Sequence, residues 1–218
     1  MSPEAILFDL DGTLVDSERE NVESVVLAVR RLGAELSAEE RAFVIGHSWN
    51  EIHALIARNH ALTVSMAGLI ASAVDEKRGL LAATGYRALP GAQEAVRRLG
   101  ARSALAVVSG ASRAEVQDAL TSIGVIAAMR LWLGAEDYAR GKPAPDSFAL
   151  AIDRLSVKAA ACVAIEDATP GILSARAAGA RVIGVRAGNF AKQPQDEADR
   201  VIETLLELDD GLLAQLFQ

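Results

Sequence analysis

The sequence predicts an α/β fold, in which a Rossmann-like parallel sheet carries helices on both faces and a helical domain is inserted after the first strand. Two observations predict the sheet: short apolar runs that do not alternate end in polar residues or glycine, and helical patterns lie between these runs. A third predicts the insert, because residues 16–84 contain no convincing strand pattern. The apolar runs are Ala5–Phe8, Ala104–Val108, Arg130–Leu133, Cys162–Ile165 and Val182–Val185.

Three helical patterns fill the insert. The first begins at Ser17, with Glu20 three residues later as in a capping box, and apolar residues follow at helical spacing. Ser48 and Glu51 begin the second in the same way, and residues 65–83 form the third. We therefore expect a core domain of residues 1–15 and 85–218 and a helical domain of residues 16–84.

The predicted core helices lie between the apolar runs. Ser112 and Glu115 form a further capping box, and Gly124 ends the helix that they begin. Pro145–Leu155 and Thr169–Ala178 show the next two helical patterns. This alternation favours parallel strands joined by crossover helices.

Composition narrows the possible partners. The chain of 218 residues has a formal net charge of −7 and no Lys/Arg run that could neutralise a track of phosphates, so we expect no nucleic acid partner. No apolar run approaches the roughly 20 residues of a membrane span, and the first residues show no signal-peptide pattern. The single cysteine, Cys162, allows no internal disulfide, which fits a cytoplasmic location.

Acidic residues follow two of the apolar runs. Asp9 and Asp11 come after the first run, and Glu166 and Asp167 come after a later one. Because sites in parallel sheets form beyond the carboxyl ends of strands, we expect these four side chains to converge. Close carboxylates repel one another unless a cation lies between them, and their oxygen atoms suit Mg²⁺. Turn preference alone is the competing explanation for acidic strand ends.

Two other features would offset the repulsion between this acidic centre and an anionic substrate. Ser109 and Gly110 follow a strand and offer a hydroxyl and an accessible backbone amide. Lys142 lies beside two prolines, which limit the backbone around it. Alone, each is typical of an ordinary loop, but together with the acidic pairs they indicate phosphate ligands.

These motifs, in this order, resemble those of the haloacid dehalogenase superfamily. The DLDGT motif at 9–13, a hydroxyl at a strand end, the lysine of KPAPD and the segment EDATPGILSARAAG span nearly the whole chain. The helical insert is similar to the small helical cap of the subgroup that contains phosphoglycolate phosphatases and β-phosphoglucomutases.

The resemblance implies a Mg²⁺-dependent phosphatase that acts on a small phosphorylated metabolite. Asp9 matches the nucleophile that forms an aspartyl phosphate, and Asp11 matches the general acid and base. Asp9, the backbone carbonyl of Asp11, Asp167 and the neighbouring Glu166 match the metal site.

The phosphate-binding groups also follow from the resemblance. Ser109 and Lys142 match the groups that hold the transferring phosphoryl oxygens, and the amide of Gly110 follows Ser109 in the chain. Gly12 allows a tight backbone beside the phosphate, and Thr13 could support that loop.

Three residues distinguish among activities within the superfamily. Asp11 favours phosphoryl transfer, because the dehalogenases proper lack this second aspartate. Lys77 is the single lysine of the insert and lies in a charged run, which disfavours the Schiff-base chemistry of the phosphonate-cleaving relatives. Trp49 follows Gly46-His47-Ser48 where β-phosphoglucomutases carry an arginine, so a phosphatase is favoured and a sugar-phosphate mutase is the alternative.

Four residues of the insert are candidates for substrate contact: Glu18, Asn21, His47 and Trp49. For Glu18 and Asn21 the alternative interpretation is an ordinary helix surface, and Trp49 could pack inside the helical domain. A non-catalytic phospho-acceptor or binding module is the alternative from another class, but it would not account for an insert that could close over a substrate. The substrate and the choice between monomer and homodimer stay open.

Overall fold

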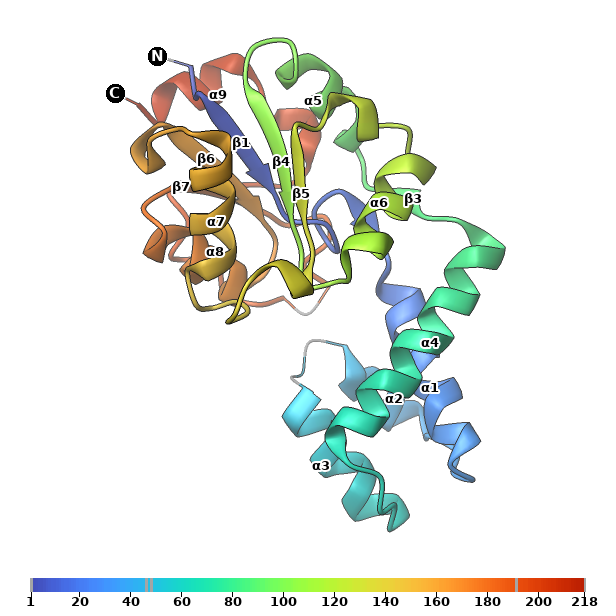
Figure 1. Ribbon diagram of the computed structural model, residues 1–218. Helices are drawn as coiled ribbons and strands as arrows, with labels where there is room; N and C mark the ends of the chain where they lie inside the picture. Colours follow the sequence, from blue (N-terminus) through green and yellow to red (C-terminus); the bar gives the residue numbers. More distant parts are fainter. Residues whose placement is uncertain (1, 46, 48, 191, 218) are drawn as a thin grey trace. The chain divides into compact units, whose positions relative to one another are not determined.

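The structure, a computed structural model, describes residues 2–45, 47, 49–190 and 192–217. Its internal contacts define two compact units, which are treated separately here (Figure 1). The core unit comprises Met1–Asp16, Tyr86–Asn189 and Gln193–Gln218, and the helical unit comprises Ser17–Gly85 and Phe190–Lys192.

A six-stranded parallel sheet forms the centre of the core unit, with the strand order β5-β4-β1-β6-β7-β8. Its strands are β1 (Ala5–Phe8), β4 (Ala104–Val108), β5 (Leu131–Leu133), β6 (Cys162–Glu166), β7 (Arg181–Val185) and β8 (Arg200–Ile202). The prediction of a parallel α/β fold is confirmed. The sequence patterns indicated five of these strands, and β8 was missed because only three residues form it and two of them are exposed.

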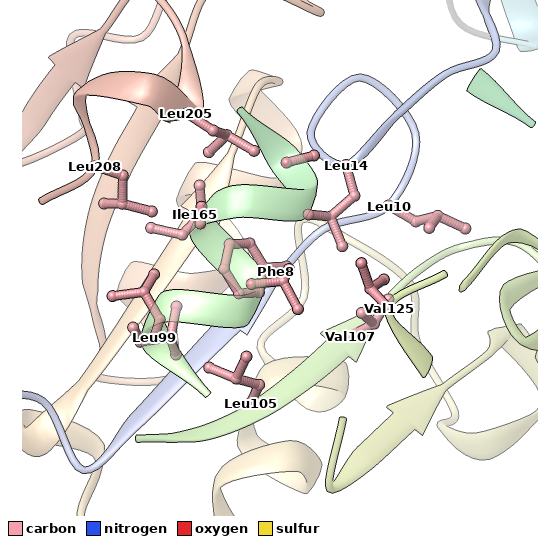
Figure 2. Packing of buried hydrophobic residues seen from close by; sticks show 14 of the residues in the cluster. Phe8, Leu10, Leu14, Leu99, Leu105, Val107, Val125, Ile165, Leu205 and Leu208 are labelled. Atoms are coloured by element: carbon pink, nitrogen blue, oxygen red, sulfur yellow. The ribbon is translucent and has the colours of Figure 1, made fainter. Parts of the chain in front are cut away.

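Alternate residues of the central strand β1 face opposite sides of the sheet. Ile6 and Phe8 join an apolar cluster with residues of α5 (Ala92–Leu99), α6 (Arg113–Ser122) and α9 (Asp210–Gln215). Ala5 and Leu7 join a second cluster with residues of α7 (Asp146–Leu155) and α8 (Thr169–Ala177). Figure 2 shows Phe8 at the centre of the first cluster. Helices therefore cover both faces, and β1 is apolar throughout because both of its faces are buried.

The helices of the core unit are α5 (Ala92–Leu99), α6 (Arg113–Ser122), α7 (Asp146–Leu155), α8 (Thr169–Ala177) and α9 (Asp210–Gln215). The capping box predicted at Ser112 is confirmed, since its hydroxyl accepts from the amide of Glu115 and the Glu115 carboxylate accepts from the amide of Ser112. Gly124 follows this helix with a φ of 70°, as its predicted role as a helix stop requires.

The described residues of the helical unit form four helices: α1 (Glu18–Arg31), α2 (Ala38–Val44), α3 (Trp49–His60) and α4 (Met66–Thr84). Ser17 precedes α1, but its side chain makes no cap hydrogen bond, so the predicted capping box is wrong at this point. Ser37 and Glu40 form a capping box at the start of α2, and the Ser65 side chain caps α4. The cap predicted at Ser48 lies outside the described residues.

A short antiparallel pair lies in the core unit where the chain leaves for the helical unit and returns from it. Strand β2 (Val15–Asp16) pairs with β3 (Arg87–Ala88), and Asp16 faces Arg87 in the register. The expectation of no strand from Asp16 onward is therefore wrong by one residue, because a two-residue strand shows no periodicity. None of the described helices is long and apolar enough to cross a membrane.

Candidate active site

A pocket of about 230 Å³ opens where the central strands of the core unit end. Because β4, β1 and β6 are neighbours in the sheet, the residues that follow them meet at one edge. The pocket brings together seven predicted site residues: Asp9, Asp11, Ser109, Gly110, Lys142, Glu166 and Asp167. Ala111, Ala168, Pro170 and Gly171 complete its lining with small side chains.

Three of the predicted carboxylates form a tight cluster. Oxygen atoms of Asp9, Glu166 and Asp167 all lie within 4.8 Å of one another. Burial raises the pKa of Asp9 to about 8, with Glu166 and Asp11 adding to the effect and Lys142 opposing it. Burial, followed by the charges of Asp9 and Glu166, also raises the pKa of Asp167. The carboxylates of such a cluster ionise more readily when a cation lies between them. Their oxygen atoms are the ligands that a hard divalent metal ion prefers.

Asp11 lines the same pocket, but its carboxylate is not part of this cluster. That arrangement is compatible with its predicted metal contact, which uses the backbone carbonyl. Asp11 is also only partly buried, whereas Asp9 is buried. The two aspartates therefore have different surroundings although one residue separates them.

Lys142 is the cation of the pocket. Its ammonium donates hydrogen bonds to Asp9 Oδ1, to Glu166 Oε1 at 2.5 Å and to the carbonyl of Val108 at 3.0 Å. Burial alone would lower the pKa of Lys142, but the charges of Asp9 and Glu166 and their hydrogen bonds raise it above its ordinary value. Lys142 is therefore protonated at neutral pH, and it orients the Asp9 carboxylate.

The strand end at Ser109 presents two donors. The Ser109 hydroxyl oxygen accepts a hydrogen bond from the amide of Ala111 at 3.1 Å, so its proton is available to a ligand. The Tyr138 hydroxyl donates to the carbonyl of Ser109 at 2.7 Å. Since the C=O and N–H of a trans peptide point in opposite directions, this bond turns the Gly110 amide away from Tyr138. An added Cβ at Gly110 would meet nothing within 4 Å, so the backbone here is open to a ligand.

The loop of Gly12 and Thr13 supports the acidic cluster from behind. Gly12 has a φ of 82°, and an added Cβ would lie 2.4 Å from Asp167 Oδ2. Thr13 is fully buried, and its hydroxyl donates to Asp167 Oδ1 at 3.4 Å. Neither residue is among those that line the pocket, and both lie against Asp167.

The four candidates from the insert belong to the helical unit. Glu18 is the first residue of α1, and Asn21 lies one turn later; both are partly buried. The exposed His47 ring stacks on Phe43 with ring centroids 3.6 Å apart. Trp49 begins α3 and packs against the apolar core of this unit, which favours the structural interpretation of its side chain.

Tyr138 and Gln195 contact the site residues but were not predicted. Tyr138 holds the Ser109 carbonyl, and Gln195 donates to the carbonyl of Asp167 at 2.7 Å. Both come from loops far along the chain, and no spacing pattern connects them with the motifs. Gly171 was part of a quoted motif, but only the structure shows that an added Cβ would lie 1.8 Å from Glu166 Oε1.

Comparison with known proteins identifies the family to which this chain belongs. Residues 6–185 match the family model of haloacid dehalogenase-like hydrolases, and the chain belongs to this family. It is 32% identical to validoxylamine A 7'-phosphate phosphatase of Streptomyces hygroscopicus subsp. limoneus over 93% of this chain and 94% of that protein. It is 34% identical to hexitol phosphatase A of Escherichia coli, with 95% and 94% of the two chains covered.

A solved structure has the same fold as this chain. A predicted phosphoglycolate phosphatase from Haemophilus somnus superposes with a TM-score of 0.82 at 20% identity, covering 100% of this chain and 99% of the other. The predicted superfamily is confirmed, and the names of the curated relatives bear out the predicted enzyme class, a phosphoric monoester hydrolase.

Proposed function

We propose that this chain is a Mg²⁺-dependent phosphatase that hydrolyses a small phosphate monoester through an aspartyl phosphate on Asp9. The observation that carries the proposal is the placement of Asp9, which is hydrogen-bonded to Lys142 and lies within 4.8 Å of the oxygens of Glu166 and Asp167. Lys142 and a bound cation both favour the ionised form of Asp9, which is the form that attacks.

In the first step, an Asp9 carboxylate oxygen attacks phosphorus in line, and the bond from phosphorus to the ester oxygen breaks. Asp11 donates its proton to the leaving oxygen, which departs as an alcohol. In the second step, Asp11 takes a proton from water, which attacks the aspartyl phosphate and releases inorganic phosphate. Asp9 and Asp11 then return to their starting forms.

The other pocket residues bind and orient the phosphoryl group. The Ser109 hydroxyl and the Gly110 amide supply hydrogen-bond donors, and Lys142 supplies positive charge. Asp9, Asp167 and the backbone carbonyl of Asp11 would hold Mg²⁺, with Glu166 beside them. When bound, Mg²⁺ neutralises charge on the phosphoryl oxygens, so that one anion can approach another.

A chromogenic phosphate ester tests the proposal. We expect the wild-type protein to release phosphate with added Mg²⁺ and to lose this activity in chelator. Asp9→Asn should reduce kcat by at least about 10³-fold, because an amide cannot act as the nucleophile. Asp153→Asn, which changes an exposed acid of α7 in the same way, should keep wild-type activity. Undiminished turnover in Asp9→Asn would contradict a mechanism in which Asp9 is the nucleophile.

The relatives suggest which substrates to try first. The two curated relatives are named for phosphates of polyhydroxylated compounds, so we propose a sugar or polyol phosphate as the substrate class. A panel of phosphorylated metabolites, ranked by kcat/KM, tests this choice. Highest efficiency on a phosphate without a polyhydroxylated group would contradict it.

The mutase alternative has less support, because Trp49 stands where such mutases carry an arginine and packs against the core of its own unit. Conversion of a sugar 1-phosphate to the 6-phosphate in the presence of the bisphosphate would favour it. A stable phosphoprotein without turnover would instead indicate the phospho-acceptor alternative.

A further inference from the structure

A short segment after β7, Gln193–Gln195, lies against the turn that carries Asp167. The side chain of Gln195 is buried, with 7% of the residue exposed. Its Nε2 donates to the carbonyl of Asp167 at 2.7 Å and to the carbonyl of Val185 at 2.9 Å. Gln195 therefore ties the end of β7 to the main chain of a proposed metal ligand.

The same segment holds the other end of this turn. Gln193 Oε1 accepts a hydrogen bond from the amide of Thr169 at 3.0 Å. The Thr169 hydroxyl donates to the carbonyl of Pro194 at 2.6 Å. Asp167 follows the last residue of β6 and lies in a bend, so the sheet ladder does not fix its backbone. The contacts with residues 193–195 supply that restraint.

The segment is itself braced. Asn189 Nδ2 donates to the carbonyl of Gln193 at 2.7 Å, and Asn189 Oδ1 accepts from the Gln193 amide at 2.8 Å. At Gly184 of β7, an added Cβ would lie 3.2 Å from Cδ of Gln195, so a glycine there leaves room for the buried amide. These contacts hold residues 193–195 in a fixed position against the turn that carries Asp167.

We propose that Gln195 is a positioning residue for metal binding, which sets the place of the Asp167 carboxylate by holding its main chain. Gln195 is not among the residues that line the pocket, so it acts through Asp167 and touches neither metal nor substrate. The inference rests on the proposed Mg²⁺ site. Outer residues that orient metal ligands typically change affinity by roughly 10–100-fold when altered.

Gln195→Met tests the inference, because methionine has a similar length but no donor. The readout is the dissociation constant of Mg²⁺, measured by isothermal titration calorimetry without substrate, with Mn²⁺ and its paramagnetic resonance signal as a second probe. We expect binding to weaken by about tenfold or more. Turnover of the chromogenic ester should need correspondingly more Mg²⁺, and kcat should recover when Mg²⁺ saturates the site.

Gln93→Met is the matched control. Gln93 Nε2 donates to the carbonyl of Ile123 at 2.8 Å in the same unit, and Gln93 is not part of the pocket. Both variants lose a glutamine hydrogen bond to a backbone carbonyl, so both should lower the melting temperature. Only Gln195→Met should weaken Mg²⁺ binding.

Equal Mg²⁺ affinity in Gln195→Met and wild type overturns the inference and leaves the proposed function intact. Absence of Mg²⁺ binding in the wild type overturns the proposed metal site itself. If Gln195→Met does not fold, Gln195→Asn replaces it, since asparagine keeps a polar amide but is one methylene too short to keep both hydrogen bonds. Several-fold weaker Mg²⁺ binding in a folded Gln195→Asn supports the inference, and unchanged binding overturns it.

Discussion

Asp9 and Asp11 are close in the chain, but their side chains differ in burial and in their neighbours. Asp9 is buried and held by Lys142, so its carboxylate has a fixed direction and belongs to the acidic cluster. Asp11 is more exposed and its carboxylate lies outside that cluster, which suits a group that exchanges protons with a leaving group and with water. Two carboxylates in one pocket can take different catalytic roles when their environments differ in this way.

This division predicts the behaviour of Asp11→Asn. The variant should bind Mg²⁺ with nearly wild-type affinity, since its predicted metal contact is a backbone carbonyl. Loss of general acid and base catalysis should slow formation and breakdown of the phosphoenzyme by roughly 10²–10⁴-fold. Rapid-quench trapping of the phosphoenzyme measures both rates. Equal rates in variant and wild type would show that Asp11 is not the acid and base.

At the scale of elements, helix α8 begins directly behind the acidic pair at the end of β6. Gly171 lies in its first turn, and an added Cβ would lie 1.8 Å from Glu166 Oε1. Glu166 is buried and accepts a hydrogen bond from Lys142, so its carboxylate has little room to move away. The close approach of α8 to β6 therefore needs a glycine at this position.

Gly171→Ala should displace Glu166 and with it Lys142. We expect kcat/KM to fall by about tenfold or more, because misplacement by about 1 Å can cost as much as 10²-fold. Gly79→Ala in α4 is the matched control, since this exposed helical glycine has nothing within 4 Å of an added Cβ. That change should leave activity unaltered and raise the free energy of unfolding by up to about 1 kcal/mol. Steady-state kinetics and chemical denaturation measure the two effects, and wild-type activity in Gly171→Ala would contradict the prediction.

At the scale of the molecule, the pairing of β2 with β3 shows how one unit is inserted in another. Asp16 and Arg87 face each other in an antiparallel register, so the chain leaves the core unit and returns to it at neighbouring positions. All residues of the acidic pocket belong to the core unit. The core unit therefore has the elements needed to form the pocket.

Replacement of residues 17–86 by Asn-Gly tests this organisation, because two such residues close an antiparallel pair in a favoured turn. The shortened chain should unfold cooperatively and bind Mg²⁺ as the full chain does. It should also turn over the chromogenic ester, because every residue that lines the pocket belongs to the core unit. Calorimetry, Mg²⁺ titration and kinetics provide the measurements. A shortened chain that does not fold would contradict the proposed independence of the core.

Local sequence patterns determined the positions of five strands, the main helices and the acidic pairs. Buried strands need continuous apolar runs, and Ser112 with Glu115 forms its cap within a single turn, so both leave a signal in neighbouring residues. Ser17 and Glu20 have the same spacing without the cap bond, which shows that spacing permits this bond but does not require it.

Only the tertiary structure decided which of these residues meet. Lys142 follows β5 and reaches Asp9 across 133 positions of sequence because β5, β4 and β1 are consecutive in the sheet, and the strand order follows from packing of the whole unit. Tyr138 donates one hydrogen bond to a backbone carbonyl and Gln195 donates two, and such contacts leave no periodicity or motif in the sequence. The sequence by itself thus determined the chemical groups of the site, whereas long-range contacts determined their geometry and the residues that hold them.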